Sequence, residues 1–203
     1  MTVPTAESPS VSPPIEVVAL VGSAGGIRAL SHVLGALPSD LEAAVVIVVH
    51  LQAGHQSVLA EILNRHSALP VKQAARGDRL EPGHVYVAPP DAHLIVRADG
   101  ALQLDGSPPI HFLRPSADVF LNSLASSHEN RALVVVLSGA GSDGALGAAA
   151  VKGAGGFVLA QDQATSEYFG MPSAAIASGV VDRVLALDDI AAAVVELVRP
   201  SLS

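Results

Sequence analysis

Residues 17–30 read VVALVGSAGGIRAL, a pattern that predicts a β-strand, a tight turn and a helix in direct succession. The apolar run at 17–21 is typical of a strand, and from Ile27 onward apolar side chains recur at helical spacing. Glycines in the turn surround a single hydroxyl, that of Ser23. A strand-to-helix turn lies at the carboxyl edge of a sheet, beside free helix amides, so Ser23 stands where a nucleophile or a ligand contact belongs.

The turn around Ser23 admits three interpretations. It can be a glycine-rich connection in which Ser23 serves as an ordinary helix N-cap. A nucleotide site fits poorly, because residues 22–26 match neither the dinucleotide fingerprint nor a P-loop with its lysine. A nucleophile elbow is matched in part, since Gly25 stands two residues after the serine but Val21 stands where the first glycine belongs.

The composition bounds the class of protein. The 203 residues suffice for one well-buried domain, and 50% hydrophobic with 15% charged residues indicates a folded main body. A formal charge of −8 and 3% aromatic residues argue against a nucleic-acid partner. The chain has no cysteine, no signal-peptide pattern at its start and no apolar run long enough to span a bilayer. We therefore expect a soluble, cytoplasmic protein without membrane insertion.

The order of predicted elements indicates an α/β fold. Strand-type apolar runs alternate with helical patterns across residues 15–200, which favours a doubly wound, mostly parallel sheet flanked by helices in a Rossmann-like three-layer arrangement. Residues 77–106 carry short strand-like segments separated by turn residues, the first at 85–88, and predict a small antiparallel β-hairpin insertion. Residues 1–14 are rich in Pro, Ser and Thr and are expected to form a disordered tail or linker.

Three polar side chains stand at or beyond the carboxyl ends of buried apolar runs: Ser23 after the first strand, His50 at the end of the second, and Asp143 in the Gly-rich loop after the run LVVVL at 133–137. Taken singly, the histidine is an ordinary polar residue at a strand end, and Asp143 before Gly144 is an ordinary helix cap. Because the carboxyl ends of parallel strands share one edge of the sheet, we expect the three to lie close together. They then form a set of nucleophile, base and orienting carboxylate, which is recognised by geometry and not by chain order.

Some side-chain expectations follow from helical periodicity. A helix at residues 57–66 is expected to turn Val58 and Ile62 inward, with Leu59 as a further candidate, and His128 is expected to be solvated at the end of another helix. His55 and the histidine at the end of the second strand have no carboxylate spaced to complete a zinc site, so no metal is expected.

At this point the sequence resembles the catalytic domain of CheB-type chemotaxis protein-glutamate methylesterases, over about residues 17–198. The resemblance is carried by six motifs, namely VGSAGG at 21–26, VVH at 48–50, LEPGHVYVAPPDAH at 80–93, RPSAD at 114–118, LSGAGSDGALG at 137–147 and FGMP at 169–172. The fold that the family implies, a parallel sheet flanked by helices with an extra hairpin, agrees with the order of elements above.

The resemblance implies hydrolysis of glutamate γ-methyl esters on the cytoplasmic helices of chemoreceptors, with release of methanol. Some relatives also deamidate receptor glutamines. The resemblance places the nucleophile on Ser23, the general base on His50 and the orienting carboxylate on Asp143. It implies no cofactor.

Candidate oxyanion and substrate contacts on this mapping are Ala24, Gly25, Ala140, Arg114 and Met171. Two of them depart from the family pattern. Ala24 replaces a common hydroxyl residue, and Ala140 stands where many members have methionine, so substrate contacts stay open at both positions.

A basic rim is a further expectation, formed by Arg28, Arg76, Arg79 and Arg114 against acidic receptor helices, with ordinary solvated surface as the alternative for each. Many members of the family carry a receiver domain ahead of the catalytic domain. This chain is expected to contain no receiver domain and to act without phosphorylation. The rival interpretation of the whole chain is a non-catalytic module of the same fold that docks on a receptor or signalling partner.

Overall fold

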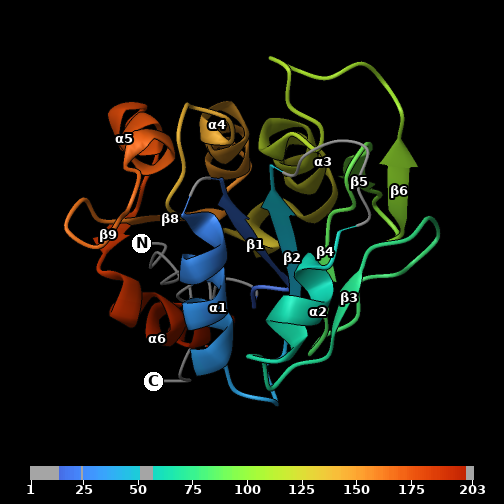
Figure 1. The fold of residues 1–203 in the computed structure, drawn as a ribbon, viewed down its shortest axis with the longest axis horizontal. Helices are drawn as coiled ribbons and strands as arrows, with labels where there is room; N and C mark the ends of the chain where they lie inside the picture. The colour runs from blue at the N-terminus through green and yellow to red at the C-terminus, as the bar shows by residue number, and fades with distance from the viewer. Residues whose placement is uncertain (1–13, 24, 51–56, 200–203) are drawn as a thin grey trace, which may run out of the picture.

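Figure 1 shows a computed structural model of the chain, which describes residues 14–23, 25–50 and 57–199. Within these residues, seven parallel strands form one sheet in the order β3-β4-β2-β1-β7-β8-β9. Their bounds are β1 Val17–Gly22, β2 Ala44–Val49, β3 Val71–Gln73, β4 Val85–Val87, β7 Ala132–Val136, β8 Phe157–Gln161 and β9 Arg183–Leu185. The predicted doubly wound α/β fold is confirmed. The prediction of a tail falls, except for Pro14, outside the described residues.

Helices cover both faces of the sheet (Figure 1). One face carries α1 (Gly26–Ala36), α2 (Leu59–Asn64) and α6 (Leu187–Val198). The other carries α3 (Ala117–His128), α4 (Ala145–Gly153), α5 (Gly170–Ala177) and a two-stranded antiparallel sheet of β5 (His93–Val96) and β6 (Leu102–Asp105). A short 3₁₀ turn, η1 (Glu129–Arg131), joins α3 to β7.

The central strand β1 shows why the strands read as continuous apolar runs. Val18 and Leu20 pack toward α1 and α6, while Ala19 and Val21 pack toward the opposite helices. Because both faces of the sheet are covered, every residue of the strand is buried and no polar alternation remains. β1 lies between β2 and β7, the point where the strand order reverses, which is where open α/β sheets place their ligand sites.

The segment at 85–88 was wrongly predicted to belong to the hairpin insertion. β4 pairs in parallel with β2 and β3 inside the main sheet, so the antiparallel insertion consists of β5 and β6 alone. A three-residue strand has the same short apolar pattern in either setting, and only its partners distinguish them.

Two side-chain predictions were also wrong. Val58 and Ile62 are exposed, by 54% and 37%, because the helix begins at Leu59 and turns Leu59 and Leu63 toward the sheet. His128 is buried beneath the end of α3, where desolvation and then the charge of Arg131 lower the pKa of its imidazole.

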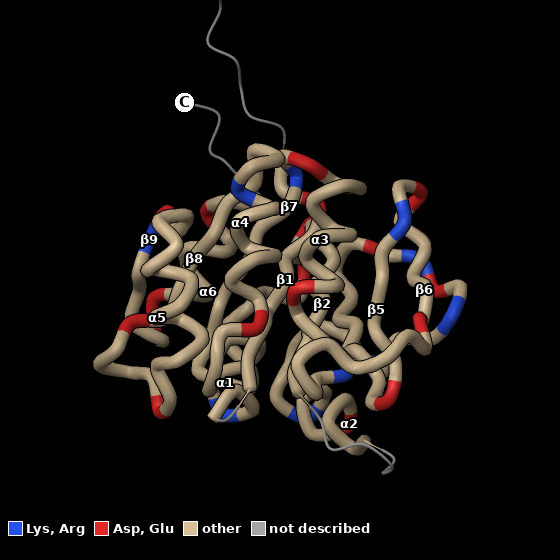
Figure 2. Tube along the Cα trace, turned by 90° about the horizontal axis from the view of Figure 1, so that it is seen from above, with Lys and Arg blue, Asp and Glu red and all other residues tan. Residues whose placement is uncertain are grey.

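Charged residues are scattered around the outside of the molecule (Figure 2). Acidic and basic segments are interspersed, and some acidic segments lie near the middle of the body in this view. None of the helices in the described part of the chain combines the length and the apolar character needed to cross a membrane.

Candidate active site

The site lies at the carboxyl edge of the sheet, where three neighbouring strands end. Ser23 follows β1, His50 follows β2, and Asp143 lies in the loop between β7 and α4. Because β1 pairs in parallel with both β2 and β7, these three chain positions meet at one edge although they are far apart in sequence. The predicted convergence of Ser23, His50 and Asp143 is found.

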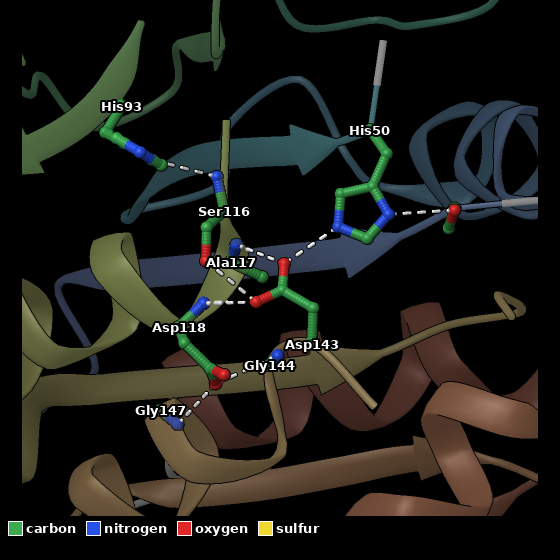
Figure 3. A network of polar contacts seen from close by, with 9 residues as sticks. His50, His93, Ser116, Ala117, Asp118, Asp143, Gly144 and Gly147 are labelled. Carbon is green, nitrogen blue, oxygen red and sulfur yellow. Dashed lines mark hydrogen bonds and ion pairs between the residues drawn. The ribbon is translucent and has the colours of Figure 1, made fainter. Parts of the chain in front are cut away.

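The three side chains form one hydrogen-bonded chain (Figure 3). The Nδ1 atom of His50 lies 2.9 Å from Ser23 Oγ, and its Nε2 atom lies 2.7 Å from Asp143 Oδ2. A carboxylate only accepts hydrogen bonds, so the ring carries its proton on Nε2 and leaves Nδ1 to accept from the serine hydroxyl. This is the arrangement of a general base beside a nucleophile.

Asp143 is held by a second set of donors at the beginning of α3. Its Oδ1 accepts hydrogen bonds from Ser116 Oγ at 2.8 Å and from the Asp118 amide at 3.2 Å. Its Oδ2 accepts from the Ala117 amide at 2.6 Å as well as from His50. The carboxylate therefore caps the positive end of a helix while it orients the histidine.

These contacts decide the charge of Asp143. Burial by itself raises the pKa of its carboxyl group. The hydrogen bonds from His50, Ala117, Ser116 and Asp118 outweigh burial, so the pKa lies below its ordinary value. The carboxylate is consequently ionised across the neutral range and can stabilise a positive imidazolium.

The backbone of the nucleophile turn is tied to the neighbouring loop. The Ser23 amide donates to the Ser138 carbonyl at 3.1 Å, and the Gly26 amide donates to the Ser23 carbonyl at 2.9 Å. Gly25 has a φ of 73°, in the left-handed region, and a Cβ atom there would lie 2.8 Å from Ser138 Oγ. The glycine is therefore required both by conformation and by space.

The other sequence-predicted contacts are distributed unevenly. Ala24 lies outside the described residues. Gly25 adjoins the nucleophile, and Ala140 is exposed in the loop after β7. Arg114 donates to the carbonyls of Gly106 and Ser107, in the loop between β6 and α3.

Met171 is buried, and its side chain packs where a Cβ on Gly139 would stand. It packs against the loop after β7 and, being buried, presents no surface to a substrate. The sequence pattern FGMP signalled this residue but could not show on which side of the loop it lies.

The structure does not assemble the four arginines of the predicted basic rim. Arg79 donates to the Asp99 carbonyl, and Asp99 lines a hollow with Glu16 and Val17 at the amino ends of the strands, the edge opposite the triad. Arg76 is tied to the Leu104 carbonyl beside β6. The chain turns between these two arginines, which carries them toward opposite edges of the sheet.

Arg28 lies in the first turn of α1, just after the turn that carries Ser23. It lines a groove of about 660 Å³ that opens beside Gly25, between α1, the loop after β8 and the start of α6. Glu167 and Asp188 line the same groove, and Asp188 pairs with His32 of α1 at 2.9 Å. The groove is thus of mixed charge and not a basic surface.

Two contributors were missed as individual residues. Ser116 and Asp118 both belong to the RPSAD motif, which signalled the segment without giving either side chain a role. The Oδ1 atom of Asp118 accepts the amides of Gly144 and Gly147, at 2.9 and 2.7 Å, at the beginning of α4. Burial, and then the charge of Asp143, raise the pKa of Asp118 against the lowering effect of these amides.

His93 also adjoins the site. It is fully buried in β5, and its Nδ1 atom accepts the Ser116 amide at 3.2 Å (Figure 3). Among the described residues, no cluster of three or more His, Asp or Glu side chains is placed to hold a metal ion.

Comparison with known proteins gives a consistent result. The sequence model of a family described as CheB methylesterase matches residues 18–194. A protein of Maricaulis maris named protein-glutamate methylesterase/protein-glutamine glutaminase is 41% identical over 183 residues, which cover 89% of this chain and 46% of that relative. A relative of Anaeromyxobacter dehalogenans, named protein-glutamate methylesterase/protein-glutamine glutaminase 2, is 42% identical over 192 residues, covering 95% and 56%.

The crystal structure of the CheB methylesterase catalytic domain of Thermotoga maritima is similar with a TM-score of 0.86 and 38% sequence identity. The match covers 90% of this chain and 98% of that one. The chain thus spans about half the length of the curated relatives it matches and nearly all of the solved catalytic domain.

Proposed function

The chain belongs to the CheB methylesterase family, and on that premise we propose that it hydrolyses glutamate γ-methyl esters on chemoreceptors through Ser23, His50 and Asp143. The observation that carries the proposal is the hydrogen-bonded chain from Ser23 Oγ through the His50 ring to Asp143. The same chain of contacts weighs against a module that only binds, because binding alone requires no aligned base and nucleophile.

The first half of the reaction forms an acyl-enzyme. Ser23 Oγ attacks the ester carbonyl carbon while its proton passes to His50 Nδ1. The tetrahedral intermediate collapses as the imidazolium returns that proton to the departing methoxide, which leaves as methanol. Asp143 stabilises the imidazolium across the 2.7 Å contact to Nε2.

The second half uses water. His50 removes a proton from a water molecule, the resulting nucleophile attacks the acyl carbon, and the bond to Ser23 Oγ breaks. The serine recovers its proton, and the product is a glutamate carboxylate. The depressed pKa of Asp143 supports this cycle, because the carboxylate keeps its charge through both transfers.

The oxyanion of each intermediate needs hydrogen-bond donors close to Ser23. The Gly26 amide is taken by the Ser23 carbonyl and the Gly139 amide by the Tyr168 carbonyl. Of the described candidates from the sequence, the Gly25 amide at the beginning of α1 is the donor that we assign to this role.

The proposed partners are the cytoplasmic helices of chemoreceptors, which would place the protein in the cytoplasm. The names of the relatives also include a glutaminase activity. Deamidation of a receptor glutamine would pass through the same acyl-enzyme, with ammonia as the leaving group in place of methanol.

The test is a direct assay on a methylated cytoplasmic chemoreceptor fragment. We expect release of one methanol for each new carboxylate, and release of ammonia from a fragment that carries glutamine at the modified position. A trapped acyl-enzyme should map to the peptide that contains Ser23. Absence of methanol release from several methylated fragments would rule out the esterase.

A further inference from the structure

The loop between β6 and α3 projects from the body of the molecule as an arch (Figure 1). Residues 106–113 read GSPPIHFL and contain no acidic residue, lysine or arginine. At its tip, Ile110 and Leu113 exchange two backbone hydrogen bonds, of 3.1 and 2.8 Å, and so close a two-residue turn.

The residues in this turn are unusual for their conformation. His111 has a φ of 49° and Phe112 a φ of 66°, both in the left-handed region. Two-residue turns with positive φ at both positions favour Asn-Gly, because bulky side chains are strained there. Phe112 is also 100% exposed, so packing within this chain does not account for the aromatic ring.

The base of the arch is held by hydrogen bonds that connect it to Asp143. The buried His93 approaches the Pro108 carbonyl with Nε2 at 3.2 Å and accepts the Ser116 amide on Nδ1. Arg114 adds a hydrogen bond to the Ser107 carbonyl at 3.2 Å. Ser116 in turn donates to Asp143, so the turn is held in a defined position relative to the triad.

Other large apolar side chains are exposed on the segments that begin at the same edge of the sheet. Ile27 in the first turn of α1 is 44% exposed, Val58 before α2 54%, Leu146 at the start of α4 73%, and Tyr168 before α5 47%. These side chains and Phe112 lie on loops or helix starts at the edge of the sheet where His50 has a side-chain exposure of 13%. Apolar residues that surround a polar reaction centre exclude water from it once a partner covers them.

We propose that the turn at 110–113 is a docking element that anchors the substrate helix, with Phe112 inserted among its apolar side chains beside the glutamyl ester. The inference rests on the proposed function and extends it to the mode of substrate recognition. A turn without acidic residues, lysine or arginine suits the apolar stripe of an amphipathic helix better than its charged face. The strained backbone at His111 and Phe112 then has a function, because strained residues are commonly found at ligand contacts.

The test measures binding to a protein in which Ser23→Ala prevents turnover. The probe is a methylated cytoplasmic chemoreceptor fragment, titrated by calorimetry. In this background we expect Phe112→Ala to weaken the affinity about tenfold or more, as for an aromatic anchor. Val184→Ala is the matched control, because Val184 is 48% exposed on β9 away from the arch and should leave the affinity unchanged.

A second variant separates docking from folding. His111→Asn with Phe112→Gly installs the sequence that this turn favours, so the melting temperature should stay equal or rise while the affinity falls as in Phe112→Ala. Phe112→Tyr should retain the affinity.

An affinity within twofold of the parent in both variants would overturn the inference. If the protein with Ser23 intact still released methanol, the proposed function would stand. No methanol release and no binding by the parent would overturn both. Self-association or vesicle binding that depended on Phe112, in place of fragment binding, would assign the turn to another occupant and overturn the inference.

Discussion

Asp118 and Asp143 cap each other's helices. Asp143, which precedes the N-cap residue Gly144 of α4, accepts the Ala117 and Asp118 amides at the beginning of α3. Asp118, in the first turn of α3, accepts the Gly144 and Gly147 amides at the beginning of α4. The carboxylate that orients His50 is therefore positioned by the packing of two helices and not by its own loop alone.

Removal of one member of this exchange should affect both stability and turnover. Asp118→Ala leaves the Gly144 and Gly147 amides without their acceptor, and we expect the free energy of unfolding to fall by about 1–2 kcal/mol. Turnover should fall as well, because α4 and the adjacent Asp143 are then no longer fixed relative to α3. Urea unfolding and methanol release measure the two effects.

The control for this variant is Asp188→Ala. Asp188 contacts His32 Nε2 at 2.9 Å on the surface, where both side chains are exposed, so its loss should cost about 0.5 kcal/mol or less. Equal destabilisation by the two variants would contradict the capping account.

Acid should remove the contribution of Asp143 to stability. Its pKa is lower in the folded protein than in the unfolded chain, so the unfolded chain takes up the proton first as the pH falls. The stabilisation is present above the ordinary aspartate pKa of about 4 and is lost as the pH falls through the folded-state value. The difference in unfolding free energy between the wild type and Asp143→Asn should therefore shrink below about pH 4.

Asp118 should show the opposite sign. Its raised pKa means that the folded protein takes up the proton first, so the proton-linked part of its contribution is present below the ordinary pKa and is lost as the pH rises through the folded-state value. The hydrogen bonds that it accepts from Gly144 and Gly147 are a separate contribution and remain above that pH. Urea titrations of Asp118→Asn and Asp143→Asn across this pH range distinguish the two carboxylates. If the unfolding free energies of both variants depended on pH in the same way, the two carboxyl groups would not be the source of the pH dependence of stability.

Ser23→Ala should abolish turnover without unfolding the protein. Loss of the nucleophile removes the acyl-enzyme path, and we expect methanol release to fall by about 10⁴-fold or more. The Ser23 side chain is partly exposed at a turn, so far-ultraviolet circular dichroism should be unchanged. Near-normal release by the folded variant would exclude Ser23 as nucleophile.

Gly139→Ala should impair turnover through the nucleophile turn. A Cβ atom on Gly139 would lie 2.9 Å from the Ser23 backbone nitrogen, so the backbone that carries the nucleophile must shift. A displacement on the order of 1 Å can cost about 100-fold in rate, which sets the expected loss of kcat.

Gly153→Ala is the matched control for that substitution. Gly153 ends α4, has no neighbour within 4 Å of the added atom and lacks a positive φ. Alanine should stabilise the helix by about 0.5–1 kcal/mol and leave kcat unchanged. Similar kcat losses in both variants would contradict the steric explanation.

The buried strands and the three polar residues at their carboxyl ends could be predicted from the sequence. Both are local features of the sequence. A strand covered on two faces must be apolar throughout, and the end of the apolar run marks the carboxyl end of the strand. The parallel doubly wound order then required Ser23, His50 and Asp143 to share one edge. Their convergence was predictable for that reason.

Features that depend on partners distant in sequence could not be predicted in the same way. β4 joins the main sheet because β2 and β3 flank it, and His128 is buried because of where α3 ends against η1 and β7. The exchange of caps between Asp118 and Asp143 needs two helices that begin side by side, which no local pattern specifies. The periodicity of apolar residues in the sequence determines which helices and strands form. The contacts between the ends of these elements depend on how the elements pack together.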